Sequence, residues 1–458
     1  MTTDMIKKVD RIQWRLLFAA LLAAVCVLNC FQTAVAEDWP TYMHDNHRSG
    51  VTSEQLEVPL ATGWVYNTNR TPQPAWAETP PRWAIWQSLT GDYDSRLAYD
   101  LAYQVAVVGD SMYFGLSNGD AVICLDAGDG SERWKFFTNG PVRFAPSVVN
   151  DKVYFGSDDG KVYCLNSANG TLIWSVKANS SDQLLFGNSR MVSASPVRSS
   201  VLVESGNAYW AAGVFSQLGW YLCSRGASNG SGGSTRSPVR PSQGYLLSAS
   251  NKLFVPAGKF NPVWYNMPSL GGGTATGVEG CYALIVDSAS LANGPGYGGA
   301  RSYINDPGAG IARVNGNCLI VNGAYSYFCD DTQLVKLTRS SGSVEWTKPS
   351  EYRYSLIMAG DTLFAGGDDE VAAFDSVTGT KMWTAPVNGR ACGLAVANGY
   401  LFVSTDLGSI HIFGDGLFDN ADLNRDRDIN ALDIRWMALE WLDCTHPDDP
   451  VRCSDITE

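Results

Sequence analysis

Near the end of the chain, oxygen-bearing side chains recur at the spacing by which one short loop wraps a calcium ion. From Asp422 to Asp433 they fall at loop positions 1, 3, 5, 9 and 12, and position 7 offers a main-chain carbonyl. This register predicts a Ca²⁺ site, with a direct or water-mediated contact from position 9, whereas a solvated acidic turn would need no such spacing. The predicted ligands are Asp422, Asn424, Asp426, Asp428, Asn430 and Asp433.

Three neighbouring features bear on this calcium loop. Arg427 stands at loop position 6, where Gly normally allows the sharp turn, so calcium affinity should be weakened. The segment from about Ala431 to Leu442 is predicted to be a helix that is apolar on two sides and therefore needs a partner. Cys444 and Cys453 follow, and in an exported protein they are predicted to form a disulfide.

The rest of the chain shows no recognisable catalytic set. Its four histidines form no triad with a defensible spacing, and the pair His44 and His47 is interpreted as part of a turn rather than as a metal site. Cys124 and Cys164 stand at the same position of neighbouring repeats and are interpreted as small core residues. We therefore assign no catalytic and no cofactor-binding residue.

Charge and composition narrow the class of protein. The 458 residues include 33 Lys and Arg against 46 Asp and Glu, and the net charge of -13 would repel nucleic acid, so no nucleic-acid partner is expected. Gly is frequent at 46 residues, while only 17% of residues are charged. This composition favours short strands joined by tight turns over long surface helices.

The N-terminus has the pattern of a secretory signal peptide. Basic residues between positions 7 and 15 precede an apolar run at 16–28, and Ala34-Val35-Ala36 offers a cleavage site before Glu37. The run is shorter than the roughly 20 residues of a spanning helix, so no membrane span is expected. Cys30 leaves a lipoprotein as the alternative, although no small residue precedes it. The pattern predicts a secreted, periplasmic or cell-surface protein.

An internal repeat occupies the middle of the chain. The segment from Asn150 to Trp174 reads as three strands joined by turns at Asp159-Gly160 and Asn169-Gly170, which is an antiparallel meander. The same pattern ends at Trp134, Trp346 and Trp383, each time with Gly four residues before the Trp.

Weaker copies raise the number of repeats to seven. Their strands are centred on Tyr113, Tyr154, Tyr209, Phe254, Ile320, Phe364 and Phe402. Longer gaps are interpreted as inserted loops, at 225–243 and 271–310, although the weak signals between 210 and 306 leave six or eight repeats open. A period near 40 residues predicts an all-β fold, a β-propeller of about seven four-stranded blades. The strand at 63–66 is predicted to close the ring by pairing with 410–413.

Two parts of the sequence resemble known protein families. The unit D-x-x-x-G-x-x-x-W resembles the repeats of pyrroloquinoline-quinone-like propellers, which also occur in the outer-membrane assembly lipoprotein B family, and covers roughly residues 38–416. In that family the Trp and Gly dock blade on blade, so the resemblance implies architecture rather than chemistry. The calcium loop and its helix resemble half of a type I dockerin. The expected domains are a signal peptide (1–36), the propeller (37–416) and an EF-hand-like, dockerin-like helical tail (417–458).

These patterns lead us to expect a non-catalytic extracytoplasmic scaffold, linked to polysaccharide utilisation or envelope assembly, which binds a protein or glycan at its propeller loops. Aromatic residues at Trp264-Tyr265 and Tyr325–Tyr327 could line such a surface. A cohesin-like partner for the tail competes with docking of the tail onto the propeller, because the second dockerin repeat is missing. The alternative function is a quinone-dependent dehydrogenase. The resemblance then implies a quinone held over calcium and capped by adjacent cysteines, and since no two cysteines are adjacent here, we expect no such quinone.

Overall fold

A computed structural model gives the structure of the protein, and it describes residues 36–75, 99–187, 190–287, 290–295, 304–306, 310 and 313–414. The chain divides into two compact units, Met1–Ala36 and Glu37–Glu458. Its described part is built from strands, with one short 3-10 helix at Ser216–Leu218. None of the described residues forms a helix long and apolar enough to cross a membrane.

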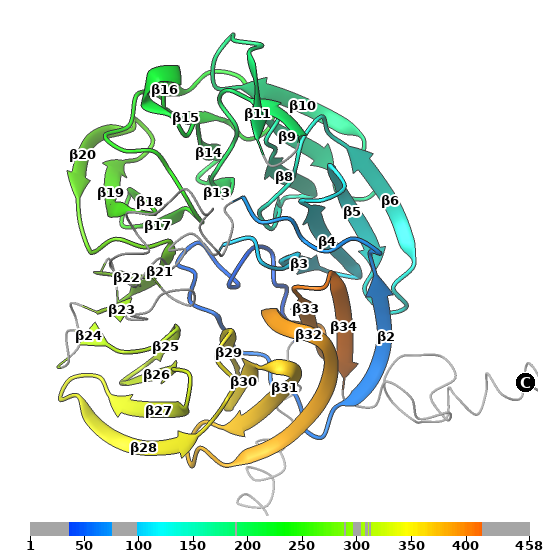
Figure 1. Cartoon of the computed structure of the whole chain (residues 1–458), viewed down its shortest axis with the longest axis vertical. Coiled ribbons are helices and arrows are strands. Elements are labelled where there is room, and N and C mark those ends of the chain that lie inside the picture. The colour runs from blue at the N-terminus through cyan, green and yellow to red at the C-terminus, as the bar shows by residue number, and fades with distance from the viewer. Residues whose placement is uncertain are drawn as a thin grey trace, which may run out of the picture. The chain divides into compact units, whose positions relative to one another are not determined.

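Six separate antiparallel sheets have four strands each (Figure 1). Blade 1 contains β3 Val105–Val108, β4 Ser111–Leu116, β5 Ala121–Asp126 and β6 Glu132–Phe137. Blade 2 contains β7 Ser147–Val149, β8 Lys152–Gly156, β9 Lys161–Asn166 and β10 Leu172–Lys177. Blade 3 contains β13 Leu202–Glu204, β14 Asn207–Ala212, β15 Tyr221–Gly226 and β16 Ser234–Arg236. Blade 4 contains β17 Leu247–Ala249, β18 Lys252–Ala257, β19 Phe260–Asn266 and β20 Gly271–Ala275.

The same order continues through the second half of the ring. Blade 5 contains β21 Tyr282–Val286, β22 Ser290–Gly294, β23 Ile304–Asn305 and β24 Arg313–Val314. Blade 6 contains β25 Cys318–Asn322, β26 Tyr325–Cys329, β27 Gln333–Thr338 and β28 Ser343–Pro349. An eight-stranded sheet then holds two further blades, because the long strand β32 pairs with β31 through its first half and with β33 through its second. Blade 7 contains β29 Ser355–Ala359, β30 Thr362–Gly366, β31 Asp368–Asp375 and the first half of β32 Lys381–Ala397, and β1 Val51–Thr52 pairs with β29 at its inner edge. Blade 8 contains the second half of β32, β33 Tyr400–Thr405, β34 Ser409–Gly414 and β2 Ala61–Asn67.

The described residues therefore form eight four-stranded blades, and the expected number of seven is wrong. The missed unit is blade 5, which lies largely within the stretch 271–310 that we interpreted as an inserted loop. Two of its strands are only two residues long, so they show no alternation of apolar and polar residues from which a strand could be predicted.

The ring closes where the sequence predicts. Strand β2 pairs antiparallel with β34, with Val65 opposite His411 and Tyr66 opposite Ile410, so residues from the start and end of the propeller share blade 8. This pairing leaves neither segment with an open edge there. His411 is buried in this sheet; its Nε2 accepts a hydrogen bond from the main-chain N of Asn388 at 3.2 Å, and burial lowers its pKa.

Neighbouring blades dock through the repeated Trp and Gly, as the resemblance implied. The Trp134 indole of blade 1 donates to Ser167 O of blade 2 at 2.8 Å, and its ring covers Gly170. Gly170 has φ +68°, and a Cβ there would lie 2.7 Å from the Trp134 ring, so only glycine fits. The same ring contact recurs in the pairs Trp64 with Gly130, Trp174 with Gly230 and Trp346 with Gly379.

Blade 6 departs from this pattern at one position. Lys336 stands opposite Trp346, where Cys124 faces Trp134 in blade 1. Lys336 Nζ donates to Ser376 O at 3.1 Å, which is the carbonyl that corresponds to the indole acceptor in the other blades. Among the described residues, the indole N–H of Trp346 consequently has no hydrogen-bond partner.

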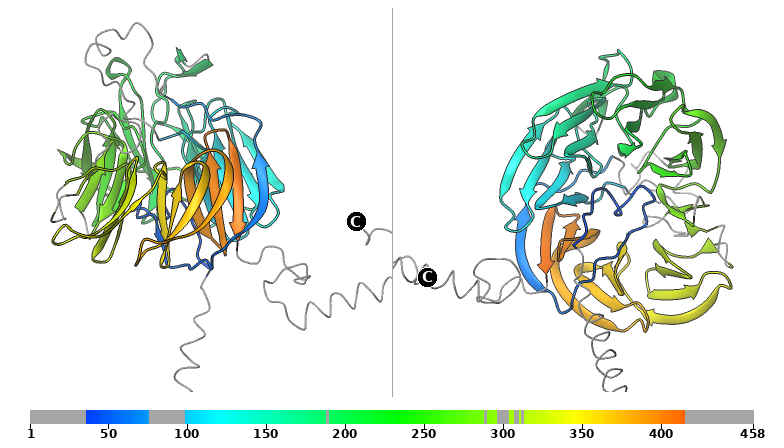
Figure 2. Two further views of the ribbon diagram at one scale, coloured as in Figure 1. Left: turned by 60° about the horizontal axis from the view of Figure 1, so that its bottom comes forward. Right: turned by 180° about the vertical axis from the view of Figure 1, so that it is seen from behind.

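The N-terminal segment, residues 37–60, runs across the centre of the ring (Figure 2, right). It binds the innermost strands of successive blades through their main-chain groups: Trp39 pairs with Val107 of blade 1, and Gly50 O accepts from Met358 N of blade 7. Intervening contacts reach blades 2, 3, 4 and 5 at Val148, Val203, Ser248 and Ile285. The segment thus occupies the channel and satisfies main-chain groups that the blades leave unpaired at their inner edges.

Candidate functional site

A small cavity, partly open to solvent, lies beside the N-terminal segment in the centre of the ring. Its walls come from the inner strands of several blades or from the residues just before them, so the ring geometry itself brings these side chains together. The lining includes Met43, Gln104, Cys281, Tyr282, Asn317, Cys318, Tyr354, Ser355, Leu356, Cys392 and Leu394.

One side of the cavity is closed by stacked aromatic rings, here called the aromatic wall: Tyr42, Tyr99, Phe144 and Tyr245. Tyr42 and Tyr245 stack with ring centres 3.7 Å apart, and Phe144 meets Tyr245 edge-on at 5.0 Å. Tyr245 Oη accepts a hydrogen bond from Ala145 N at 3.1 Å. Burial raises the pKa of both Tyr42 and Tyr245, so neither phenol is an acid or base at neutral pH.

Arg48 fixes the N-terminal segment against this wall. Its Nε donates to Leu246 O at 3.0 Å, and its Nη1 donates to Thr41 Oγ1 at 3.0 Å and to Asp45 O at 2.9 Å. The guanidinium carbon lies 5.8 Å from the centre of the Tyr245 ring. Burial lowers the pKa of Arg48 to about 10, which leaves it charged at neutral pH. These contacts give Arg48 a positioning role.

The Cys318 thiol at the cavity is a poor nucleophile. Cys318 stands directly opposite Cys329 in the β25–β26 pair. The contact with Cys329 and burial both raise the pKa of the Cys318 thiol well above its usual range, and a protonated thiol reacts slowly. Elsewhere in the core, burial raises the pKa of Cys124 and of Cys164 to about 11, which agrees with their interpretation as core residues.

The described lining does not suit a quinone with several carboxylates held over a calcium ion. Such a group needs cationic side chains for its carboxylates and carboxylate oxygens for the metal. The described residues that line the cavity include no Arg, Lys, His, Asp or Glu. Within the described ranges, no group of three His, Cys, Asp or Glu side chains could hold a metal ion. We therefore derive no reaction step through such a cofactor.

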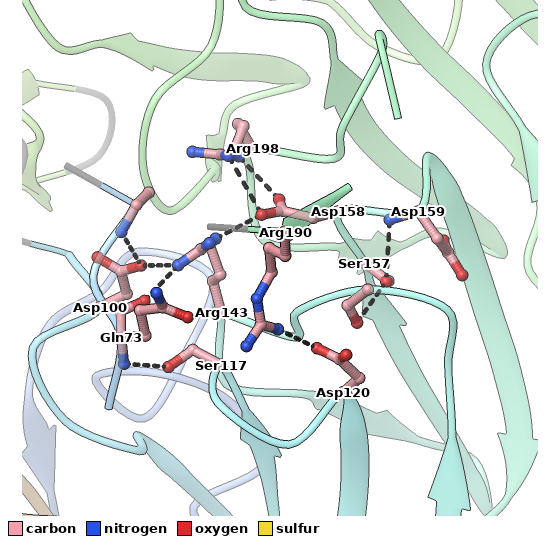
Figure 3. Close-up of polar contacts among 12 residues, drawn as sticks. Gln73, Asp100, Ser117, Asp120, Arg143, Ser157, Asp158, Asp159, Arg190 and Arg198 are labelled. Carbon is pink, nitrogen blue, oxygen red and sulfur yellow. Dashed lines mark hydrogen bonds and ion pairs between the residues drawn. The ribbon is translucent and has the colours of Figure 1, made fainter. Parts of the chain in front are cut away.

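A buried ion network lies next to the cavity (Figure 3). Arg143 donates from Nε to Asp158 at 2.7 Å and from Nη1 to Asp100 at 2.9 Å, and Arg198 donates from Nε to Asp158 at 2.8 Å. Burial raises the pKa of Asp100 despite Arg143, whereas at Arg143 the two carboxylates outweigh burial and raise its pKa. The network joins the segment before blade 1 to blades 2 and 3, and thereby holds Tyr99 in the aromatic wall.

A two-stranded hairpin between blades 2 and 3 presents the most exposed apolar surface beside this network. Its strands are β11 Leu184–Gly187 and β12 Arg190–Ser193. Phe186 stands opposite Met191, and Leu184 shares their face; these three side chains are 77%, 51% and 54% exposed, respectively. Arg190 anchors the hairpin on blade 1 by an ion pair with Asp120 at 2.6 Å (Figure 3). The apolar face, defined by Leu184, Phe186 and Met191, is thus held outward by a fixed base.

The structure tests only some of the residues singled out from the sequence. The predicted calcium ligands Asp422, Asn424, Asp426, Asp428, Asn430 and Asp433, like the cysteines of the tail, lie outside the described residues. His44 N donates to Thr41 O at 3.1 Å, which agrees with its interpretation as part of a turn, and its Nε2 lies 3.4 Å from Glu37 Oε1.

The idea that aromatic residues of the insertions form an exposed surface is wrong for two of them, because Tyr265 and Tyr327 are buried. Sequence reasoning also missed the hairpin of the apolar face. Two short apolar runs, at 184–186 and 191–192, flank a polar turn there and could have revealed it. The Asp100–Arg143–Asp158 network could not be predicted from the sequence, because no local pattern distinguishes charged residues that are buried from those that are exposed.

The sequence and the fold of this chain both match known proteins. The sequence model of the family described as outer membrane protein assembly factor BamB matches residues 63–256 and 290–405, more than half of the chain. The chain belongs to this family. No curated protein matches its sequence significantly.

Solved structures share the fold of this BamB-family chain. A quinohemoprotein alcohol dehydrogenase from Comamonas testosteroni is 12% identical with a TM-score of 0.58, over 84% of this chain and 81% of its own. A europium-containing methanol dehydrogenase is 10% identical with a TM-score of 0.56, over 82% of this chain and 98% of its own. At such low identity the likeness shows the propeller fold alone.

Proposed function

We propose that this protein is a non-catalytic scaffold of the cell envelope or exterior that binds an extended segment of a protein partner at the rim of its ring. The apolar face of Leu184, Phe186 and Met191 is the observation that carries the proposal. Large apolar side chains rarely gather in solvent without a partner, and this group stands on a hairpin that pairs with no other described strand.

The chemistry of the hairpin specifies the kind of partner. Leu185 and Val192 point to the opposite face, where Val192 is buried, so the hairpin is apolar on both sides. The hairpin pairs with no other described strand, so a partner could add to it as a further strand, with main-chain hydrogen bonds giving affinity and alternate side chains giving specificity. A strand of alternating apolar and polar residues fits this surface, and such strands are what outer-membrane barrels are made of. The family's description as an outer membrane protein assembly factor agrees with this partner.

The test uses a synthetic ten-residue peptide of alternating apolar and polar residues, and a scrambled peptide of the same composition. The double variant Phe186→Ser, Met191→Ser should bind the alternating peptide at least tenfold more weakly than the unchanged protein. Val344→Ser is the matched control, because Val344 is 59% exposed on β28 of blade 6, whereas the ion pair that anchors the hairpin is made with blade 1. Equal binding by the double variant, or equal binding of both peptides, contradicts the proposal.

Export and the tail complete the proposed function. Residues 1–36 act as the signal peptide, and the tail at 417–458 binds one Ca²⁺ through Asp422, Asn424, Asp426, Asp428, Asn430 and Asp433. The tail then either binds a cohesin-like protein or docks on the propeller through its apolar helix. Pull-down from the envelope, with and without calcium chelator, distinguishes a calcium-dependent partner of the tail from a partner of the apolar face.

The alternative function, a quinone-dependent dehydrogenase, is tested on the same preparation. Reconstitution with pyrroloquinoline quinone and calcium, followed by assay of dye reduction with alcohols and sugars, should give no bound chromophore and no turnover. Stoichiometric chromophore with dye reduction would replace the scaffold proposal. A glycan ligand would instead show itself as carbohydrate retention that survives the Phe186→Ser, Met191→Ser change.

A further inference from the structure

A buried carboxylate lies beside the point where the predicted signal peptide ends. Glu54 is only 2% exposed. Its Oε2 accepts hydrogen bonds from the main-chain N of Glu37 at 2.9 Å and of Asn398 at 3.0 Å, and its Oε1 accepts from Gly399 N. In the described structure these partners of the carboxylate are all neutral main-chain groups. A buried carboxylate that lacks a cation is costly, so this site favours a positive charge.

Glu37 is held firmly against Glu54 by its own side chain. Its Oε2 accepts hydrogen bonds from Thr52 Oγ1 at 2.5 Å and from Ser53 N at 3.0 Å, and its Oε1 lies 3.4 Å from His44 Nε2. The main-chain nitrogen of Glu37 is therefore fixed in place, at hydrogen-bond distance from the buried carboxylate.

The sequence leads us to expect cleavage of the chain at this nitrogen. The sequence Ala34-Val35-Ala36 has the small residues of a signal-peptidase site, with cleavage before Glu37. Ala36, which precedes this bond, is exposed in the structure. We propose that hydrolysis of the Ala36–Glu37 bond is a maturation step that creates a buried ion pair between the new α-ammonium group of Glu37 and Glu54. This inference rests on the export proposed above.

The chemistry of the step is ordinary peptide hydrolysis by a peptidase of the export machinery. Water adds its oxygen to the carbonyl carbon of Ala36, the C–N bond breaks, and Ala36 leaves as a carboxylate. The nitrogen of Glu37 becomes an amine that takes up a proton to give an ammonium group. One neutral N–H donor is thereby replaced by three charged donors at the same place, and hydrogen bonds between ions are shorter and stronger than neutral ones.

The location of Glu54 gives this ion pair a structural consequence. The same carboxylate holds the turn Asn398–Gly399 between β32 and β33 of blade 8, and Asn398 Nδ2 donates to Gly109 O of blade 1 at 2.8 Å. The new N-terminus would therefore be tied to the two blades that meet where the ring closes. Cleavage is expected to stabilise the folded propeller, so that the exported chain is locked only after the signal peptide has gone.

The test compares three forms of the full mature chain: one with a free Glu37 amine, one with that amine acetylated, and one that retains Ala36. The free-amine form should have the highest melting temperature, by at least about 2 °C. In Glu54→Gln the three forms should melt together, whereas in Glu57→Gln, a change at an exposed carboxylate, the difference should persist. Equal melting of the three unchanged forms, or a difference that survives Glu54→Gln, overturns the proposal.

A second measurement decides the question if Glu54→Gln does not fold. The pKa of the Glu37 α-amine, obtained from the pH dependence of its acylation rate, should exceed the ordinary value of about 7.7–8.0 by about one unit or more. An unshifted value overturns the ion pair, and N-terminal sequencing that finds a start other than Glu37 overturns the cleavage site. None of these readouts involves the apolar face, so loss of peptide binding there would contradict the proposed function alone.

Discussion

The contact between Trp134 and Gly170 makes the strongest quantitative prediction about how blades dock. Gly170→Ala introduces a Cβ at φ +68°, which costs about 1–2 kcal/mol for a left-handed residue. The same Cβ would lie 2.7 Å from the Trp134 ring, and relief by movement strains the packing and the indole hydrogen bond to Ser167 O. Overpacking of this kind costs about 1–3 kcal/mol, so the free energy of unfolding should fall by about 2–5 kcal/mol in total.

Urea unfolding followed by circular dichroism and tryptophan fluorescence measures this loss. Gly206→Ala is the matched control: Gly206 has φ +77°, but a Cβ there would meet no atom within 4 Å, so only the conformational cost of about 1–2 kcal/mol applies. Combining Gly170→Ala with Trp134→Phe should be less damaging than the sum of the two, because the smaller ring makes room for the methyl group. If Gly170→Ala is no more damaging than Gly206→Ala, the docking argument fails.

Three further predictions concern blade 6, blade 8 and the tail. Lys336→Cys should raise the melting temperature, because it removes a buried ammonium group and frees a carbonyl for the unpartnered Trp346 indole; a lower melting temperature would contradict this. Burial lowers the pKa of His411 from 6.5, so the stability it contributes is present above that pH and is lost as pH falls toward the lowered pKa. The melting temperature of His411→Gln should therefore fall less than that of the unchanged protein between about pH 7 and pH 5. Calcium at a hundredfold excess over its dissociation constant should stabilise the tail by about 2.7 kcal/mol. Calorimetry should show this binding lost in Asp422→Ala and strengthened in Arg427→Gly, and unchanged affinity in Arg427→Gly would show that position 6 does not limit the loop.

Much of the architecture could be predicted from local sequence patterns. The repeat ending at Trp134 and Trp174 predicts the meander of each blade, and the lone strand at 63–66 predicts ring closure, because both depend on short-range alternation and turn residues. Blade 5 could not be predicted in this way. Its outer strands, Ile304–Asn305 and Arg313–Val314, are too short to show a period, and the neighbouring blades dictate their pairing.

The candidate sites were harder to predict, because they depend on contacts between residues far apart in the chain. No sequence pattern around Glu54 predicts that its side chain is buried. Only the folded ring brings Glu37 and Asn398 to its carboxylate. Likewise, the main-chain hydrogen bonds of the N-terminal segment leave no side-chain pattern. The calcium loop has the opposite character: all of its ligands lie within twelve consecutive residues, so the sequence alone specifies it, and it stays a prediction.

The occupation of the ring centre explains why function is better sought at the rim. Eight inner strands leave main-chain groups facing the channel, and the N-terminal segment satisfies a group on strand after strand, from Val107 in blade 1 to Met358 in blade 7. Arg48 and the aromatic wall hold that segment in place, so a ligand that displaced it would have to replace many hydrogen bonds at once. The hairpin, in contrast, does not hold the N-terminal segment in the channel. Because it pairs with no other described strand, its apolar face can bind the proposed partner without disturbing the ring.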